Sequence, residues 1–258
     1  MIAVFRRAVA AARAQGRVPR FWLRDDDATR PGPALERLVA LCARHGIAPT
    51  LAVVPARLDP ALAGVLAPGG RVALHGWAHV NHAPRHHKKA ELGPDRPAEV
   101  VLAELARGRA RLREVFGPRA LDLLVPPWNR IAPDVAAGLP AIGIRALSAY
   151  GRVWTPAVPV LNALLDPIDW HRGRGLRDPD LLWQKLALCL VQDRPIGVLT
   201  HHRDHVGPVW GFLDRLMGES VAAGCLWLTP DRLLPVLGGD LASPGVRPWR
   251  GAPSFSSR

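Results

Sequence analysis

The sequence predicts an α/β fold in which parallel strands close into a barrel. Short apolar strands alternate with amphipathic helices in about seven strand–helix units, which is the pattern of a parallel sheet covered by helices. The 258 residues show no shift of composition that would mark a domain boundary, and about 250 residues is a common length for an α/β barrel. Polar clusters follow several predicted strands at their carboxyl ends, where barrel enzymes hold their active sites.

The elements of the N-terminal half follow from apolar periodicity and from Gly and Pro. Residues 33–45 repeat apolar side chains at helical spacing and stop at Gly46, whereas residues 50–54 form a continuous apolar run closed by Pro55. The polar stretch 80–96 predicts a long loop. The predicted strands are 21–23, 50–54 and 72–74, and the predicted helices are 1–14, 33–45, 60–66 and 97–116.

The C-terminal half continues the alternation of short apolar runs and helical repeats. Strands are predicted at 121–125, 142–147, 160–165, 196–199 and 225–228, and helices at 133–139, 180–191, 209–217 and 230–237. After Gly238 the residues are mostly Gly, Pro, Ser and Arg. We therefore expect a single catalytic barrel domain over residues 1–240 and a loosely ordered tail over residues 241–258.

The net charge of +12 is carried almost entirely by arginine, because Lys88, Lys89 and Lys185 are the only lysines. Such a charge fits an anionic partner, but a codon bias that replaces Lys by Arg is the preferred explanation. The arginines are spread along the chain, and no basic arm or aromatic RNA-binding motif is visible. Nucleic acid is therefore not an expected partner, and the polar run from His86 to Lys89 is interpreted as a solvated loop.

The cysteines and the N-terminal segment predict a cytoplasmic protein. Cys42, Cys189 and Cys225 are far apart and lack CxxC spacing, which indicates free thiols in a reducing compartment. Three arginines interrupt the first 14 residues, so this segment lacks the apolar core of a signal peptide. No run of about 18 apolar residues occurs, and no membrane span is expected.

Two histidines and a cluster of acids predict a metal site. His75 and His79 lie four residues apart after a strand, so their rings can face one point if the chain turns there. Asp25, Asp26 and Asp27 follow the first strand, and like charges this close raise one another's pKa unless a cation neutralises them. A helix N-terminus is the alternative explanation for the acids. One Asp with two His suits a divalent metal and leaves room for a water, which suggests hydrolysis.

We expect one divalent ion at this site, with zinc as the first choice and Co, Ni, Fe or Mn as alternatives. Asp27 is the working choice for the ligand, and Asp26 is the working choice for the general base. The assignment among the three acids stays open, because a shift of one residue exchanges the roles. Asp25 is placed with the substrate pocket.

Polar and aromatic residues at further strand ends complete that pocket. Trp128 follows two prolines and can stack on a sugar face, although a buried Trp in a rigid turn is the alternative. Asp169 and Trp170 again place an acid beside an aromatic ring. His201 follows another strand and is a candidate general acid for a leaving amine, whereas His202 alternates to the opposite side.

The chain resembles the polysaccharide deacetylase family in five blocks that occur in the family's order. Residues 23–27, 75–79, 125–128, 169–170 and 199–201 are similar to the family's TFDD, HxxxH, RxPY/W-type, Asp-Trp and LxH motifs. The resemblance implies a distorted (β/α)7 barrel and a metal-dependent N- or O-deacetylase. Carried over, Asp26 becomes the base, Asp27, His75 and His79 become the metal ligands, and His201 becomes the acid.

Two departures from the family pattern matter. Val125 stands where the third motif usually carries an arginine, and Arg24 or Arg130 is a candidate replacement. The export signal of secreted members is also missing, which favours a small or intracellular substrate. A non-catalytic carbohydrate-binding relative is therefore one alternative.

The preferred hypothesis is a hydrolase that acts on a carbon–nitrogen bond other than a peptide bond. It would remove an acetyl group from an N-acetylated, or O-acetylated, sugar or oligosaccharide. Hydrolysis of another linear amide or ester on the same barrel is the second enzymatic hypothesis.

Overall fold

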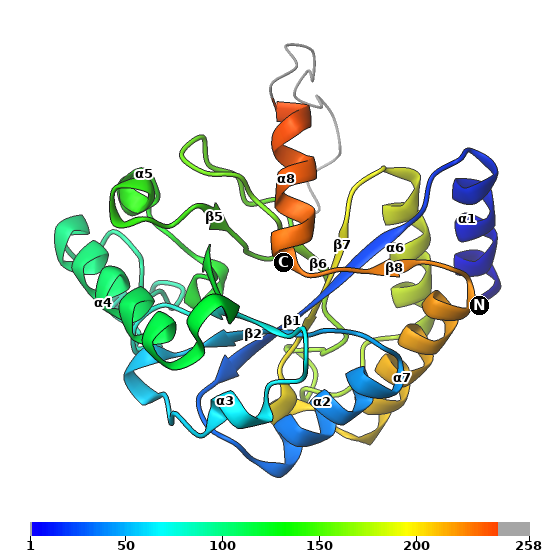
Figure 1. Cartoon of the computed structure of the whole chain (residues 1–258), viewed down its shortest axis with the longest axis horizontal. Helices are drawn as coiled ribbons and strands as arrows, with labels where there is room; N and C mark the ends of the chain where they lie inside the picture. Colours follow the sequence, from blue (N-terminus) through cyan, green and yellow to red (C-terminus); the bar gives the residue numbers. More distant parts are fainter. Residues whose placement is uncertain (1, 242–258) are drawn as a thin grey trace.

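A curled parallel sheet forms the centre of the protein (Figure 1). The computed structural model describes residues 2–241, with side chains up to residue 235. The expected tail, 241–258, lies outside this range except for its first residue. The strands are β1 (Arg20–Ala28), β2 (Thr50–Val53), β3 (Arg71–Leu74), β4 (Ala120–Leu124), β5 (Ala146–Leu147), β6 (Ala163–Leu165), β7 (Ile196–Thr200) and β8 (Leu226–Trp227).

Helices surround the outside of this sheet, and α4, α3, α2, α7, α6 and α1 can be followed around it in Figure 1. Their bounds are α1 (Ile2–Ala14), α2 (Pro33–Arg44), α3 (Leu62–Val65), α4 (Ala98–Phe116), α5 (Pro133–Gly138), α6 (Pro179–Val191), α7 (Gly207–Ala222) and α8 (Pro230–Leu241). No helix among the described residues is long and apolar enough to cross a membrane.

The strand order is β5-β4-β3-β2-β1-β7-β6, with every pair parallel, and the short strand β8 pairs with the beginning of β1. Irregular segments connect the two edge strands, β5 and β6. The amide of Leu161 donates to the carbonyl of Leu147 (2.9 Å), and the amide of Ala163 donates to the carbonyl of Ala149 (2.8 Å). The sheet therefore curls round on itself. The expected fold class, a distorted (β/α)7 barrel, is confirmed.

The strand register brings several carboxyl ends to one edge of the sheet. Asp25 in β1 lies opposite Thr200 in β7 and Leu51 in β2, and Val53 in β2 lies opposite Leu74 at the end of β3. Residues that follow β3 and β7 are thus neighbours of the acids of β1. This placement was expected for parallel strands that share one sheet.

β1, β5 and β6 differ from the predicted strands by more than one residue at one end, and β6 covers only residues 163–165 of the predicted 160–165. β1 continues through the three acids to Ala28, because the backbone pairing with β2 and β7 persists where the apolar pattern stops. β5 covers only residues 146–147 of the predicted 142–147, because a 3-10 turn and Gly143, with a left-handed φ of 77°, precede it.

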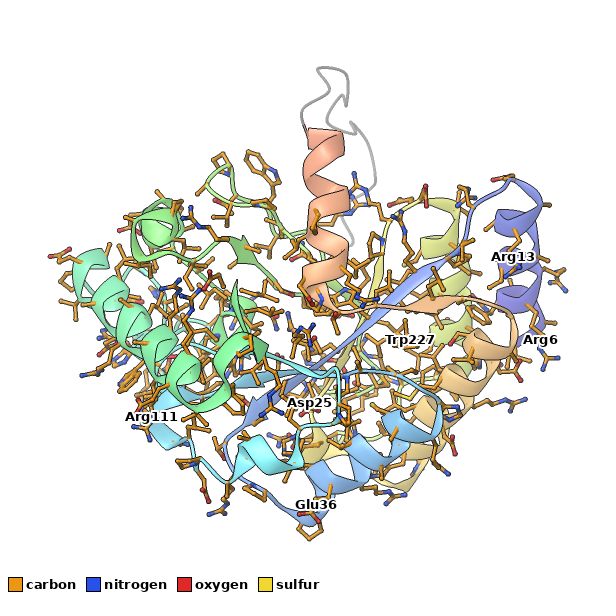
Figure 2. All side chains as sticks on the ribbon, viewed as in Figure 1. Arg6, Arg13, Asp25, Glu36, Arg111 and Trp227 are labelled. Carbon is orange, nitrogen blue, oxygen red and sulfur yellow. The ribbon has the colours of Figure 1, made fainter. Side chains whose placement is uncertain are left out.

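The core consists mainly of two apolar clusters. One packs α1, α6 and α7 against β1 and β7, and the other packs α3, α4 and α5 against β2, β3 and β4. Figure 2 shows Asp25 near the centre of the molecule, whereas Glu36 and Arg111 lie toward its outside. All three cysteines are unpaired, and Cys189 is only half-buried.

Candidate metal centre and active site

Three side chains from two strand ends converge on one point. Asp27 lies in β1, His75 directly follows β3, and His79 lies in the same loop. Oδ1 of Asp27 is 3.2 Å from Nε2 of His75 and 3.2 Å from Nε2 of His79, and one ligand atom from each residue lies within 4.8 Å of the other two. Ligands about 2.1 Å from one tetrahedral ion are roughly 3.4 Å apart, so this donor set fits a single divalent ion.

The backbone conformation aims these side chains at the shared point. Asp27 and His79 have left-handed φ values of 68° and 55°, which residues with a Cβ rarely adopt outside functional sites. The pairing of β1 with β2 shifts register between Asp25 and Ala28, beside Asp27. Nδ1 of His75 donates to the carbonyl of Val125 (2.9 Å), which leaves Nε2 facing Asp27.

The electrostatics of this cluster favour the charged form of the carboxyl group. Burial raises the pKa of Asp27, but the hydrogen bond and charge of His75 and the charge of His79 outweigh it and hold that pKa below its ordinary value. Burial and the charge of His75 lower the pKa of His79. A carboxylate at Asp27 and a neutral imidazole at His79 are the forms that bind a cation.

Asp26 is held by an arginine from its own strand. Nη2 of Arg24 donates to Oδ2 of Asp26 (3.0 Å), and Nε lies 2.9 Å from Oδ1 as an ion-pair contact without hydrogen-bond alignment. Arg24 is fully buried and also donates to Oδ1 of Asn129 (2.8 Å) and Oγ of Ser148 (2.9 Å). Of the two candidate arginines, Arg24 is therefore the one that contacts Asp26, while Arg130 donates elsewhere, to the carbonyl of Lys89.

His201, the residue after β7, faces Asp26. Its Nε2 lies 4.0 Å from Oδ2 of Asp26, and its ring meets the Trp170 ring edge-on with centroids 4.7 Å apart. Nε1 of Trp170 donates to Oδ2 of Asp166 (2.7 Å), and burial raises the pKa of Asp166 despite this bond. The general-base candidate, Asp26, and the general-acid candidate, His201, thus face each other.

Asp25 does not line the substrate pocket, which corrects the sequence-based expectation. The side chain is fully buried, and its two oxygens lie 2.8 Å from Oγ1 of Thr200 and 2.5 Å from Nδ1 of His202. The His202 amide also donates to it (3.0 Å). Strand alternation explains this, because Asp25 and His202 both point behind the site. Asp25 is a structural anchor between β1 and β7.

The remaining predicted pocket residues lie in two places. The half-buried Trp128 places its ring 4.3 Å from the ring of His79, next to the ligand cluster. Trp170 lies against His201, as described above. Oδ1 of Asp169 accepts the amides of His171 (3.1 Å) and Arg172 (3.2 Å), so this carboxylate caps its own turn.

The sequence analysis missed Glu91, which lies in the predicted loop 80–96. Glu91 is buried, and its Oε1 accepts the amides of Ala78 (2.7 Å) and Trp77 (3.3 Å) inside the HxxxH segment. A Cβ on Gly76 would lie 2.0 Å from Oε2 of Glu91, so only glycine fits there. No local pattern predicts this contact, whereas Asp166 directly follows β6 and the strand-end rule could have found it.

The sequence matches no family model and no curated protein. Solved structures share its fold at low identity. Peptidoglycan deacetylase PdaC from Bacillus subtilis is 17% identical with a TM-score of 0.55, over 87% of this chain and 94% of that chain. A family 4 acetyl xylan esterase from Clostridium thermocellum, in complex with a cobalt ion, is 15% identical with a TM-score of 0.56, over 85% and 92%.

A CE4 family pseudoenzyme from Bacillus anthracis has a similar fold, with 14% identity and a TM-score of 0.58, over 84% of this chain and 66% of that chain. These structures belong to the family that the sequence motifs resemble, so the resemblance is confirmed at the level of the fold. The presence of a pseudoenzyme among them means that the activity has to be argued from the site itself.

Proposed function

We propose that this chain is a metal-dependent hydrolase that removes an acetyl group from an N-acetylated, or O-acetylated, sugar or oligosaccharide. The observation that carries the proposal is the convergence of Asp27, His75 and His79 beside the facing pair Asp26 and His201. For an N-acetyl substrate, the bond cleaved is a carbon–nitrogen bond other than a peptide bond.

Asp27, His75 and His79 would hold one divalent ion, with zinc as the first choice. Such an ion polarises an acyl carbonyl and lowers the pKa of a water. Asp26 accepts the proton of the attacking water, and the buried guanidinium of Arg24 fixes the orientation of its carboxylate. His201 donates a proton to the departing amine. The water oxygen bonds to the acyl carbon as the carbon–nitrogen bond breaks, leaving acetate and a free amino sugar.

The aromatic rings around the centre support a sugar substrate. Trp128 flanks the ligand His79, and Trp170 flanks the acid His201. Both rings are half-buried, so each keeps an exposed part on which a sugar face can stack. The non-catalytic alternative was based on the missing arginine at position 125. Arg24 argues against it, because it places a cation beside Asp26.

Metal analysis of the purified protein, combined with acetate release from N-acetylglucosamine oligomers and acetylated xylan, tests this proposal. Asp26→Asn should retain about one equivalent of metal and lose turnover by at least about a hundredfold. His75→Ala should lose the metal. Acetate release by the Asp26→Asn variant at the wild-type rate would remove Asp26 from the mechanism, and wild-type protein without stoichiometric metal would end the proposal.

We also propose a cytoplasmic location. The three unpaired thiols support it, because oxidising compartments favour disulfides. Cell fractionation with an antibody against the chain tests it, and recovery from the culture medium would contradict it.

A further inference from the structure

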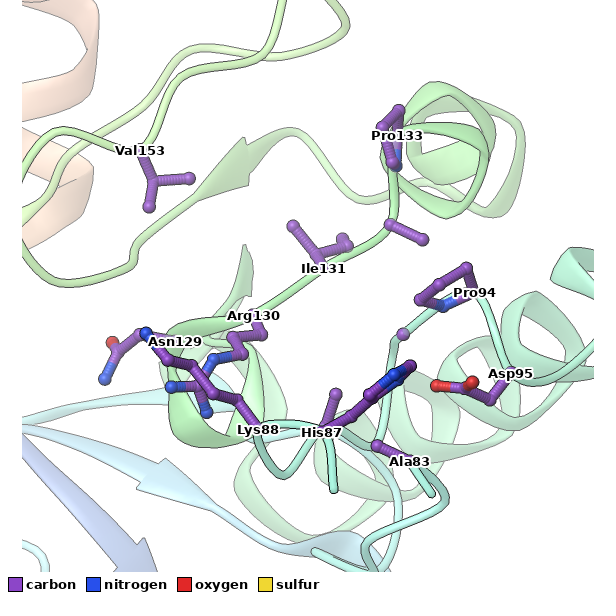
Figure 3. A pocket seen from close by; sticks show the side chains of 13 residues that line it. Ala83, His87, Lys88, Pro94, Asp95, Asn129, Arg130, Ile131, Pro133 and Val153 are labelled. Carbon is purple, nitrogen blue, oxygen red and sulfur yellow. The ribbon is translucent and has the colours of Figure 1, made fainter. Parts of the chain in front are cut away.

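A cavity of about 430 Å3 lies between the loop that follows His79 and the segment that follows β4 (Figure 3). One wall comes from residues 83–95 of the loop that follows His79, and the other comes from residues 129–133 after β4. Asn129 joins the cavity to the site, because it lines the cavity and its Oδ1 accepts from Arg24. Arg24 in turn donates to Asp26, so Asn129 and Arg24 connect the cavity wall to the candidate general base.

Backbone contacts hold the two walls together. The amide of Ala132 donates to the carbonyl of Leu92 (2.7 Å), and Leu92 forms a parallel bridge with Ile131. Arg130 donates to the carbonyl of Lys89 (2.8 Å). These contacts fix the loop against the β4–α5 connection, so the backbone of the two cavity walls needs little ordering on binding.

The cavity is lined by unpaired cations. Lys88 and Arg130 line it with His87, and neither forms a salt bridge with a described residue. Asp95 is the one acid among the lining residues, and in Figure 3 the His87 ring extends toward it while Lys88 extends toward Asn129. The positive side of the cavity is thus the side nearer the centre.

This loop is enriched in lysine relative to the rest of the chain. A bias that replaces lysine by arginine explains the many arginines, but two of the only three lysines, Lys88 and Lys89, lie side by side here. Between residues 82 and 90 the loop has no acid, and the exposed run from Arg85 to Lys89 is entirely basic or His. A lysine ammonium is a compact point charge that suits a carboxylate or phosphate group.

We propose that this basic cavity binds an anionic group of the substrate, so that the preferred substrate is an acidic acetylated saccharide. This inference rests on the proposed function, because it places the anionic group next to the acetyl group that the centre would hydrolyse. The group is a carboxylate, as in a uronic acid, or a phosphate ester. The run His86–Lys89 is exposed, as the sequence predicted, and this proposal adds a binding role to it.

Calorimetric titration of the full, zinc-loaded chain tests the inference. Two acidic probes, a hyaluronan tetrasaccharide and N-acetylglucosamine 6-phosphate, separate a carboxylate from a phosphate. Their neutral references are a chitin tetrasaccharide and N-acetylglucosamine. We expect at least one acidic probe to bind about five- to tenfold more tightly than its reference, and the double variant Lys88→Gln/Lys89→Gln to lose that preference. Removing the zinc with a chelator should leave the preference in place, because the cavity and not the ion causes it.

Lys185→Gln is the matched control, because Lys185 is the third lysine and lies on α6, where it donates to the hydroxyl of Tyr150 (2.9 Å). It should keep the preference for the acidic probe.

Equal affinities for acidic and neutral probes, or an equal effect of the Lys185 substitution, would overturn the inference. A short single-stranded DNA that displaces both acidic sugars would also overturn it, in favour of a nucleic-acid surface. Binding that depends on Lys88 and Lys89 without any acetate release would instead refute the proposed function and leave the cavity's ligand class standing.

Discussion

Arg24 places a buried positive charge beside Asp26, a neighbour in the same strand. Its guanidinium is fully buried and holds Asp26, Asn129 and Ser148 together. Replacing Arg24 with Met keeps the apolar stem but leaves the carboxylate of Asp26 buried without its counter-charge. We expect a loss of about 3 to 5 kcal/mol in the free energy of unfolding, measured by denaturant titration, because an uncompensated buried charge is costly.

Arg6→Met is the matched control for that prediction. Arg6 also contacts one carboxylate, that of Glu219, through two nitrogens, at 2.8 Å and 2.6 Å, but on the exposed surface. The unfolding midpoint of the Arg6→Met variant should stay close to that of the wild type, since exposed ion pairs contribute little to stability. Equal losses in the two variants would show that burial of the pair is not what matters.

Glu91 is expected to position the metal ligands without touching the metal. It accepts two amides of the segment between His75 and His79, and thereby supports the left-handed conformation of His79. Glu91→Ala should weaken metal binding by about 10- to 100-fold, which is typical of residues that orient ligands. Competition with a metal-binding dye measures this directly, and activity is not needed as a readout.

Glu91→Gln provides the contrast, because its side-chain oxygen can still accept the amides of Trp77 and Ala78. It should keep metal affinity within a few-fold of the wild type. Glu99→Ala, an exposed acid in the first turn of α4, controls for the loss of a negative charge. If all three variants bind metal as tightly as the wild type, Glu91 has no positioning role.

Local patterns predicted those site residues that lie at strand ends. Asp27, His75 and His79 do converge, because parallel strands bring such residues to one edge. The alternation that set His202 apart from His201 also explains Asp25, since the two pair behind the site. Glu91 and Asn129 could not be predicted, because their roles depend on contacts between loops that no periodicity encodes.

At the level of elements, amphipathic helices and apolar strands were the most predictable parts. α2, α4 and α6 lie within one residue of their predicted bounds. The strands β5 and β6 are shorter than predicted, because their apolar residues pack in irregular chain whose backbone bonds close the sheet. Apolar content alone does not separate a strand from a buried loop of this kind.

The connection between β7 and α7 should make the stability depend on pH. Burial lowers the pKa of His205 to about 4, while its ring packs edge-on against Trp210 and its Nε2 accepts the amide of His201 (3.2 Å). The unfolded chain, with an ordinary pKa of 6.5, binds more protons than the folded chain between these two values. The stability from this group is therefore present above about pH 6.5 and is lost as the pH falls towards 4.

His205→Gln should reduce this loss, since glutamine keeps an acceptor for the His201 amide but does not titrate. Between pH 7 and pH 5 we expect the variant to lose about 2 kcal/mol less unfolding free energy than the wild type. His171→Gln, at an exposed histidine, should leave the wild-type pH dependence unchanged. Parallel curves for His205→Gln and the wild type would rule out His205 as the source.

At the scale of the whole molecule, α1 packs behind β1 and β7, which are neighbours in the sheet. The N-terminal helix packs along α6 and contributes Phe5 and Val9 to the cluster that lies behind β1 and β7. Asp26 lies in β1 and His201 directly follows β7, so the first helix supports the base and the acid without touching either. The sequence predicted this helix from its amphipathic pattern but could not show which elements it covers.

Phe5→Ala tests whether α1 unfolds together with the barrel. Phe5 is fully buried, with ring centroids 5.3 Å from Trp183 and 6.4 Å from Phe21. Truncation should lower the free energy of unfolding by about 3 to 5 kcal/mol in one cooperative transition, because it leaves a cavity between α6 and β1. Arg7→Ala, on the exposed face of α1, should leave the stability nearly unchanged. Tryptophan fluorescence and circular dichroism should follow the same transition; an early fluorescence change with the helix signal intact would mean that α1 docks independently of the sheet.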